Sequence, residues 1–244
     1  MLTDCTWEIS NIGRTTAEIT VAVDDVFNAE DVCDALNGYQ YVVVKVPMKR
    51  VEINECLSKM GFCLIEVQMN VSMSVRNFDV IRIETIYKDI DFEPVDNEIS
   101  LSRLVTKIVP GMFCTDRISL DSRFGLTISA NRYRNWINTE YSNGDARITV
   151  VRYQGEEVGF MMFKIMGNTF KLLLNGLYKP FQGRGLGIIT PASPFMYISK
   201  YTLGLDKVIT SISSNNIPIV KLYNRLGFTL DSQYYVFVNN DCIQ

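Results

Sequence analysis

The sequence predicts a mixed α/β fold of the α+β type. Two observations lead to this prediction. Short β-branched and alternating runs, typical of strands, occur along the whole chain between segments with helical periodicity. In addition, a glycine-rich stretch from Gly183 to Gly187 follows a strand-like run and precedes a helical one. The chain has 244 residues, 47% of them apolar, so it can form one large or two small domains with a real core.

The first 90 residues are expected to form an α/β domain of their own. Its expected elements are a strand at 17–23, a helix at 29–36, a strand at 39–46, a helix at 51–60 and a strand at 62–71. Residues 76–98 are rich in Asp, Glu and Asn, which places a boundary near Asp91. We therefore divide the chain into residues 1–90, expected to cover the substrate or to mediate dimerisation, and residues 91–244.

The second part is expected to place antiparallel strands before a closing β-loop-α-β-α-β segment. Its expected elements are a helix at 100–109, a loop at 117–126, a helix at 129–141, hairpin strands at 148–153 and 157–165, a strand at 170–178, a helix to about 203, a strand at 208–213, a helix at 217–226 and one or two strands at 228–238. Pro191 and Pro194 interrupt the helix that follows the glycines, so we expect this helix to start late or to bend.

One internal similarity links the two parts. Residues 56–62, Cys-Leu-Ser-Lys-Met-Gly-Phe, resemble residues 222–228, Leu-Tyr-Asn-Arg-Leu-Gly-Phe. Both stretches are typical of a helix that ends at a left-handed glycine and leads into a strand. The similarity reflects either a common helix-to-strand turn or a half-domain related to the C-terminal one.

Composition excludes several functional classes. The net charge is −3, without the basic excess of a duplex-binding surface, so no nucleic-acid partner is expected. No apolar run reaches the roughly 18–20 residues that span a bilayer, and the N-terminus has no signal-peptide pattern, so a cytoplasmic protein is expected. The chain has no histidine, which excludes His-based triads and His-ligated zinc, and no metal is expected.

The glycine-rich stretch is the strongest functional signal. It lacks the Lys-Ser/Thr pair of a P-loop and the third glycine of a dinucleotide fingerprint. It does fit Gln-x-x-Gly-x-Gly, with Gln182, Gly185 and Gly187. A strand, a glycine-rich loop and a helix start aim backbone N–H groups at one point, as a diphosphate requires, and Arg184 could add a charged contact. An ordinary turn is the alternative.

Together with residues 216–228, this loop resembles the Gcn5-related N-acetyltransferase (GNAT) superfamily over residues 92–238. The resemblance implies the GNAT fold with an additional N-terminal α/β domain, or alternatively a partial GNAT-like half. It implies acetyl-CoA as co-substrate, with the pantetheine arm between strands 170–178 and 208–213. The residues that it places at the cofactor are Leu177, Tyr178, Gln182, Gly183, Arg184, Gly185, Leu186, Gly187 and Asn216.

The resemblance also implies direct attack of a primary amine on the acetyl thioester. Tyr223 would lie near the thioester sulfur and protonate the leaving thiolate, with a packed aromatic side chain as the alternative. No carboxylate lies in residues 170–178, so no general base is assigned, and water-mediated deprotonation is favoured. We expect the oxyanion donor to be a backbone N–H near Leu177, where the adjacent Gly176 is consistent with a bulge.

The N-terminal α/β part resembles the extra domain of the dTDP-4-amino-4,6-dideoxygalactose N-acetyltransferases, and residues 122–124, 131–137, 227–228 and 234–237 also resemble these enzymes. This narrower resemblance implies an amino sugar nucleotide, or another small metabolite, as acceptor. Arg123 and Arg132 belong to a group of arginines that could bind its phosphates, with solvated surface charges as the alternative. A polyamine, antibiotic or protein N-terminal acceptor, a non-catalytic acyl-CoA sensor and a homodimer stay open.

Overall fold

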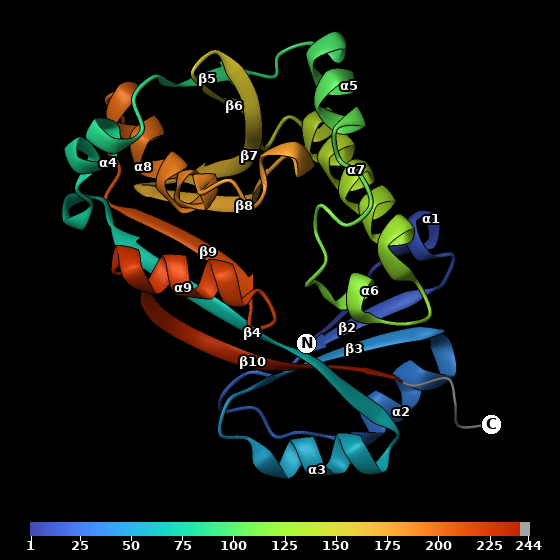
Figure 1. The fold of residues 1–244 in the computed structure, drawn as a ribbon. Coiled ribbons are helices and arrows are strands. Elements are labelled where there is room, and N and C mark those ends of the chain that lie inside the picture. Colours follow the sequence, from blue (N-terminus) through green and yellow to red (C-terminus); the bar gives the residue numbers. More distant parts are fainter. Residues whose placement is uncertain (240–244) are drawn as a thin grey trace.

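The structure is a computed structural model, and it describes residues 1–239. These residues form a single ten-stranded mixed sheet with helices on both faces, in the order β1-β2-β3-β10-β4-β9-β8-β7-β6-β5 (Figure 1). The strands are β1 (Leu2–Asp4), β2 (Thr16–Thr20), β3 (Tyr41–Pro47), β4 (Phe62–Ser74), β5 (Ile90–Pro94), β6 (Arg147–Tyr153), β7 (Glu156–Met166), β8 (Thr169–Leu177), β9 (Lys207–Ser213) and β10 (Thr229–Asn239). The predicted mixed α/β class is confirmed.

Helices are interspersed with the strands along the chain. They are α1 (Glu8–Ile12), α2 (Ala29–Gly38), α3 (Val51–Lys59), α4 (Val80–Ile86), α5 (Glu98–Thr106), α6 (Arg117–Leu120), α7 (Gly125–Asn143), α8 (Ile189–Lys200) and α9 (Ile217–Leu226). Short 3₁₀ helices lie at η1 (Val75–Asn77), η2 (Lys179–Phe181) and η3 (Leu186–Ile188).

Alternating residues of each strand build separate cores on the two faces of the sheet. In β3, Val42 and Val44 pack with α2 and α3, whereas Tyr41 and Val43 pack with residues of α1 and α6. The same alternation places α8 and α9 on one face of the C-terminal strands and α5 and α7 on the other. The period-two pattern of these strands therefore determines which helices cover each face.

The two ends of the chain repeat one arrangement. The order β2-α2-β3-α3-β4 matches β8-α8-β9-α9-β10, and both β2–β3 and β8–β9 are parallel pairs. Gly61 and Gly227 both adopt positive φ, 83° and 89°, before β4 and β10. The structure therefore favours a related half-domain as the origin of the similarity between residues 56–62 and 222–228.

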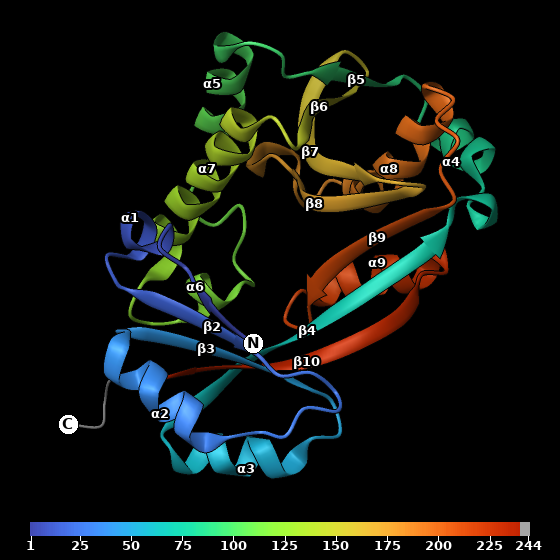
Figure 2. The same ribbon diagram turned by 180° about the vertical axis from the view of Figure 1, so that it is seen from behind.

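The two halves exchange their last strands. β10 lies between β3 and β4, and β4 lies between β10 and β9, as both views show (Figures 1 and 2). β4 and β10 are antiparallel, and Gln68 pairs with Tyr234, each seven residues after its glycine, 61 to 68 and 227 to 234. The central pair thus has approximate two-fold symmetry. The boundary near residue 90 stays a prediction.

One expected element is wrong in detail, and the stretch assigned to the domain boundary contains elements that were not predicted. The expected loop at 117–126 begins with α6, because Asp116 Oδ1 accepts hydrogen bonds from the amides of Ile118 and Ser119 at 3.0 and 3.2 Å. The acidic stretch at 76–98 contains both α4 and β5. In each case a local cap or a strand partner decides the structure, and composition does not show it.

Of the two expected effects of the prolines on the helix after the glycines, the late start is also wrong, and the bend stays a prediction. α8 begins at Ile189, with Pro191 in its first turn and Pro194 inside the helix. Pro194 has no N–H to offer the carbonyl of Thr190, four residues earlier. The Asn175 side chain of β8 donates to that carbonyl instead, at 2.7 Å. A strand side chain therefore replaces the missing helical hydrogen bond.

Candidate functional site

The neighbouring parallel strands β8 and β9 pair only at their first residues. Their paired positions run from Thr169 with Lys207 to Lys171 with Ile209. Beyond these positions β8 continues to Leu177 beside β7, and β9 continues to Ser213 beside β4. The facing edges of residues 172–177 and 210–213 are therefore unpaired with each other, and we call the space between them the interstrand gap (Figure 1).

The glycine loop lies at the wide end of this gap, between β8 and α8. Gly183 and Gly185 have φ of 75° and 80°, a region that glycine adopts without strain. Within residues 1–239, the amides of Gly183, Arg184 and Gly185 donate no hydrogen bond to another protein group. Successive free amides at a helix start form a concave anion-binding surface.

Side chains from other segments hold the loop in place. The Gln182 side-chain amide donates to the carbonyls of Met112 and Leu177, both at 3.1 Å. The Tyr87 hydroxyl donates to the Gly185 carbonyl at 3.1 Å. The predicted cofactor residue Gln182 thus supports the loop from behind, and the loop amides are fixed before any ligand binds.

Tyr223 lies at the narrow end of the gap. It is 3% exposed, and its ring packs against the ring of Phe228, with the two ring centroids 4.5 Å apart. Burial raises the pKa of its phenol, and a hydrogen bond with the Thr210 side chain opposes the rise. The Thr210 hydroxyl donates to the Leu172 carbonyl at 3.1 Å, across the point where β8 and β9 separate. The phenol is therefore protonated at neutral pH and lies where the two strands diverge.

The direction of each backbone amide determines whether Leu177 or Tyr178 can donate a hydrogen bond into the interstrand gap. The Tyr178 amide donates to the Val158 carbonyl of β7 at 2.9 Å. Because successive amides of a strand point to opposite sides, the Leu177 amide points toward the interstrand gap. The register shift of β8 lies between Leu172 and Leu174, so the bulge expected beside Gly176 is misplaced by several residues.

Comparisons with known proteins give the architecture. No family model matches the sequence. A 68-residue segment is 38% identical to the mycothiol acetyltransferase of Corynebacterium aurimucosum, covering 27% of this chain and only 21% of that protein's length. A functionally unknown conserved protein from Staphylococcus epidermidis matches with a TM-score of 0.62 and 16% identity, over 92% of this chain and 84% of that chain.

Two further solved structures match over most of this chain. A GCN5-related N-acetyltransferase from Kribbella flavida gives a TM-score of 0.56 and 12% identity over 92% of this chain and 81% of its own. A tandem GNAT protein from the clavulanic acid biosynthesis pathway gives a TM-score of 0.56 and 13% identity, over 91% of this chain and 74% of its own. The chain has the GNAT fold. The predicted fold is thus confirmed, and the interstrand gap lies at the position where the GNAT resemblance places the pantetheine arm.

Asn216 and Leu186 have structural contacts in this GNAT fold. Asn216 is the N-cap of α9, and its side chain accepts a hydrogen bond from the Ile219 amide at 3.3 Å. Leu186 packs against the core under α8. Gly187 allows close packing of η3 on α9, since an added Cβ would lie 3.2 Å from Leu222 Cδ1. The cofactor roles of these residues stay predictions.

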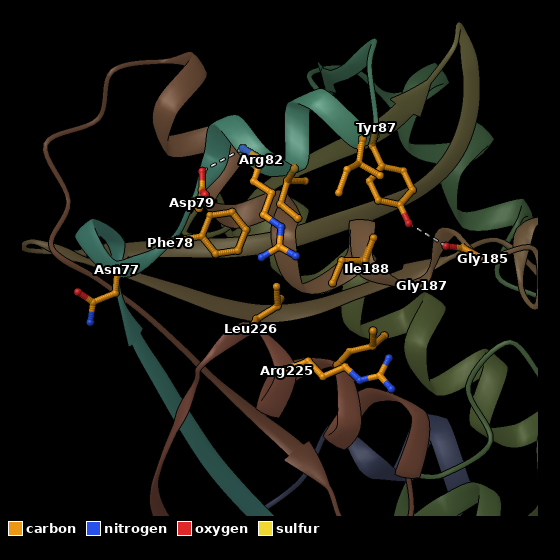
Figure 3. A pocket seen from close by; sticks show the side chains of 13 residues that line it. Asn77, Phe78, Asp79, Arg82, Tyr87, Gly185, Gly187, Ile188, Arg225 and Leu226 are labelled. Carbon is orange, nitrogen blue, oxygen red and sulfur yellow. Dashed lines mark hydrogen bonds between the residues drawn. The ribbon is translucent and has the colours of Figure 1, made fainter.

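A cavity of about 650 Å³ borders the glycine loop of the GNAT core. Gly185, Gly187 and Ile188 form one side, α4 a second and α9 a third (Figure 3). The Arg82 side chain points from α4 into this space, toward α9, which carries Arg225 (Figure 3). Arg82 is not predicted from the sequence because it lies in the stretch assigned to the domain boundary.

The predicted substrate ligands Arg123 and Arg132 lie where α1, α6 and α7 meet. Arg123 pairs with Asp121 at 2.6 Å, and Arg132 pairs with Glu8 at 2.7 Å. Arg117 also contacts Glu8, at 3.3 Å. These arginines therefore hold carboxylates of the protein, and a phosphate would have to replace those partners. Their assignment as substrate ligands stays a prediction.

A polar strip on the central strands was missed from the sequence. Glu66, Gln68 and Asn70 alternate with apolar residues along β4, and their register places them on the same face as Ser211 and Ser213 of β9. Asn70 accepts hydrogen bonds from Gln68 at 3.1 Å and Ser211 at 2.7 Å. Asn70 also donates to Ser232 of β10 at 2.9 Å. The alternation of polar and apolar residues is the sequence signal for this strip, but by itself it predicts only a strand.

Glu66 is the acidic group of this polar strip. Burial raises the pKa of its carboxyl, and nearby Asp116 raises it further. A hydrogen bond with Ser213 and the charges of Arg117 and Lys45 oppose the rise. A half-buried carboxyl with a raised pKa, beside the end of β9, is suited to accept a proton or to bind an ammonium group.

Residues 1–239 contain no candidate membrane span and no candidate metal centre. Within this range no helix combines the length and apolarity needed to cross a bilayer. The same range contains no group of three or more Cys, Asp or Glu side chains arranged to hold a metal ion.

Proposed function

We propose that the protein is an acetyl-CoA-dependent N-acetyltransferase. The observation that carries this proposal is the alignment of three features within the GNAT fold. Free amides of the glycine loop lie at one end of the interstrand gap, and Tyr223 lies at the other. A diphosphate on the loop would place the pantetheine arm between β8 and β9, with its sulfur near the phenol. The matched segment of a mycothiol acetyltransferase adds support.

In the proposed reaction the amine nitrogen attacks the thioester carbonyl carbon. The carbonyl oxygen then carries the negative charge, and we assign its hydrogen-bond donor to the bulge at residues 172–174, which leaves one residue of β8 unpaired beside Thr210. As the carbon–sulfur bond breaks, the thiolate takes a proton from Tyr223. The amine loses its proton to Glu66 or to water.

The acceptor in this proposal is a small polar amine, and an amino sugar nucleotide is its narrower form. Support comes from the polar strip, which offers amide and hydroxyl groups on the face of the sheet opposite α9. Such groups match the hydroxyls of a sugar, and an apolar acceptor would leave them unpaired. Arg123 and Arg132 give the phosphate part no independent support, because both are ion-paired.

Substituting the loop glycine tests cofactor binding. Gly185 and Gly13 have φ of 80° and 69°, and an added Cβ would meet nothing within 4 Å at either position. Gly185→Ala and Gly13→Ala should therefore have a similar stability cost of about 1–2 kcal/mol. Only Gly185→Ala displaces the loop amides, and we expect it to weaken acetyl-CoA binding about tenfold in isothermal titration.

The outcomes of that titration separate the possible functions. Wild-type protein that binds acetyl-CoA and releases thiol with an amine from a panel supports the enzyme. Binding without thiol release on any amine favours the acyl-CoA sensor instead. Equal affinity of the two glycine variants for acetyl-CoA would remove the loop from the binding site.

Glu66→Gln tests the acceptor side. Because burial raises the pKa of the Glu66 carboxyl, its ionised form destabilises the fold at pH values above that pKa. The neutral amide removes this cost, so we expect the unfolding midpoint at pH 8 to rise by about 2–4 °C. The difference should vanish below pH of about 4, where the carboxyl is protonated in both folded and unfolded chains.

The same variant should lose activity while it gains stability. Without a negative charge on the polar strip, turnover of a cognate amine should fall about tenfold, equivalent to about 1.4 kcal/mol. The exposed Glu55→Gln on α3 is the control, and it should change neither property. A Glu66→Gln variant with full activity would leave water as the proton acceptor.

A further inference from the structure

The face of the sheet opposite α9 changes in polarity across the interstrand gap. On the side of β4 and β9 this face carries the polar strip. On the side of β8, Leu173 and Leu174 are half-buried and pack against the apolar core under α5 and α7. A hydrocarbon chain laid on the polar strip would leave its amide and hydroxyl groups unpaired. Because the thioester carbonyl is assigned to the bulge of β8, an acyl chain longer than acetyl would extend over β8.

The ring of Phe113 covers the next part of this surface. An added Cβ at Gly176 of β8 would lie 3.0 and 3.1 Å from the Cε1 and Cζ atoms of this ring, so the ring tip packs directly on the strand backbone. Glycine in a strand often marks such a close approach. Gly176 belongs to residues 172–177, the part of β8 that does not pair with β9. The ring therefore lies beside the interstrand gap, on the surface that follows Leu173 and Leu174.

Contacts with three other segments fix the Phe113 ring. It packs against the ring of Tyr133 of α7, with the two centroids 4.4 Å apart, and it meets the ring of Phe160 of β7 edge-on, with the centroids 6.3 Å apart. The backbone beside it is tied to the glycine loop, because the Gln182 side chain donates to the Met112 carbonyl at 3.1 Å. A chain that pushed the ring aside would have to break these contacts, which is costly in a packed core.

We propose that Phe113 limits the length of the acyl group that the protein accepts, so that acetyl is admitted and a chain as long as hexanoyl is excluded. The inference rests on the proposed function and extends it to selection among acyl donors. The selection is steric, because an acetyl group ends before the ring whereas a longer chain on β8 meets it. Phe113 is therefore a specificity-determining residue that takes no part in proton transfer.

The test compares the affinities of acetyl-CoA and hexanoyl-CoA by isothermal titration of the full chain. Wild-type protein should bind hexanoyl-CoA about tenfold more weakly than acetyl-CoA, because the chain has to displace the ring or lie on polar groups. Phe113→Ala removes the ring, so it should bind hexanoyl-CoA about tenfold more tightly than wild type does and change the acetyl-CoA affinity by less than about twofold. Binding is the readout, so the test does not depend on the acceptor amine.

Two further variants separate the effect of the ring from a general loss of packing. Phe113→Leu keeps an apolar side chain that is smaller than the ring, so it disturbs the fold less than alanine does and should give an intermediate ratio of the two affinities. Phe27→Ala is the matched control, since Phe27 is also half-buried but packs against the core of the N-terminal half. It should retain the wild-type ratio.

The outcomes separate the inference from the function. Equal affinities of wild-type protein for the two thioesters would overturn the length limit and leave the acetyltransferase proposal intact. A wild-type ratio in both Phe113 variants would overturn the assignment to this ring. An equally large change of the ratio in Phe27→Ala would also overturn it, because the effect would not depend on the position of the ring. If wild-type protein bound neither thioester, the proposed function would fail as well.

Discussion

Replacing Tyr223 with Phe is expected to lower turnover about 10²-fold and to leave CoA affinity within about twofold. The phenylalanine ring preserves the contact with Phe228 and removes only the hydroxyl beside Thr210. Because burial raises the pKa of the phenol, the wild-type group stays protonated and can supply a proton to the leaving thiolate at neutral pH. Thiol release with saturating amine and titration with CoA measure the two effects separately.

Tyr41→Phe is the matched control for this prediction. Tyr41 is fully buried in the N-terminal half, and its hydroxyl has no hydrogen-bond partner in the described residues. Removing that hydroxyl should leave turnover unchanged, and it should not lower stability. Turnover of Tyr223→Phe within about twofold of wild type would assign Tyr223 to packing alone.

Removing the carboxylate of Glu8 is expected to destabilise the fold by about 3–5 kcal/mol. Glu8 is 1% exposed and pairs with Arg132 at 2.7 Å and Arg117 at 3.3 Å. In Glu8→Ala both guanidinium groups lose this partner where α1 meets α6 and α7. Urea unfolding at pH 7.5 measures the loss. Glu55→Ala is the control, because its pair with Lys59 is exposed and should contribute less than about 1 kcal/mol.

The pH dependence of this effect has a defined sign. Burial acts to raise the pKa of the Glu8 carboxyl, but Arg132 and Arg117 outweigh it and hold that pKa below its usual value. A lowered folded-state pKa stabilises the protein above the unfolded-state value of about 4.3, and the stabilisation is lost as the pH falls through the folded-state pKa. The difference between wild type and Glu8→Ala should therefore shrink in acid. A constant difference from pH 7.5 to pH 3 would contradict the ion-pair explanation.

Local signals predicted the C-terminal part of the fold well. The glycine loop, the strands on either side of the interstrand gap and the helix carrying Tyr223 lie close to their expected positions. Each depends on contacts between near neighbours in the chain, such as the cap at Asn216 and the left-handed Gly227. The expected late start of α8 was wrong because of a contact that is not local. The carbonyl of Thr190, left free by Pro194, accepts a hydrogen bond from Asn175, which lies fifteen residues before Thr190.

The rest of the site depends on contacts that no local pattern shows. The polar strip forms only because β4 is inserted beside β9, which brings Gln68 next to Ser213. Arg82 lines the same cavity as the glycine loop because Phe78 and Tyr87 dock α4 on the C-terminal half. Sequence spacing gave no reason to relate these residues, and the two arginines that it selected as substrate ligands, Arg123 and Arg132, lie in ion pairs.

The exchanged strands also constrain how the polypeptide matures on the ribosome. β3 and β4 are made before the strand next to both of them, β10, which is translated only after residues 75–228. Until it emerges, both strands expose backbone edges that can pair with other chains. We therefore expect a nascent chain to need protection by chaperones until β10 emerges, and a product truncated before residue 229 to be prone to aggregate.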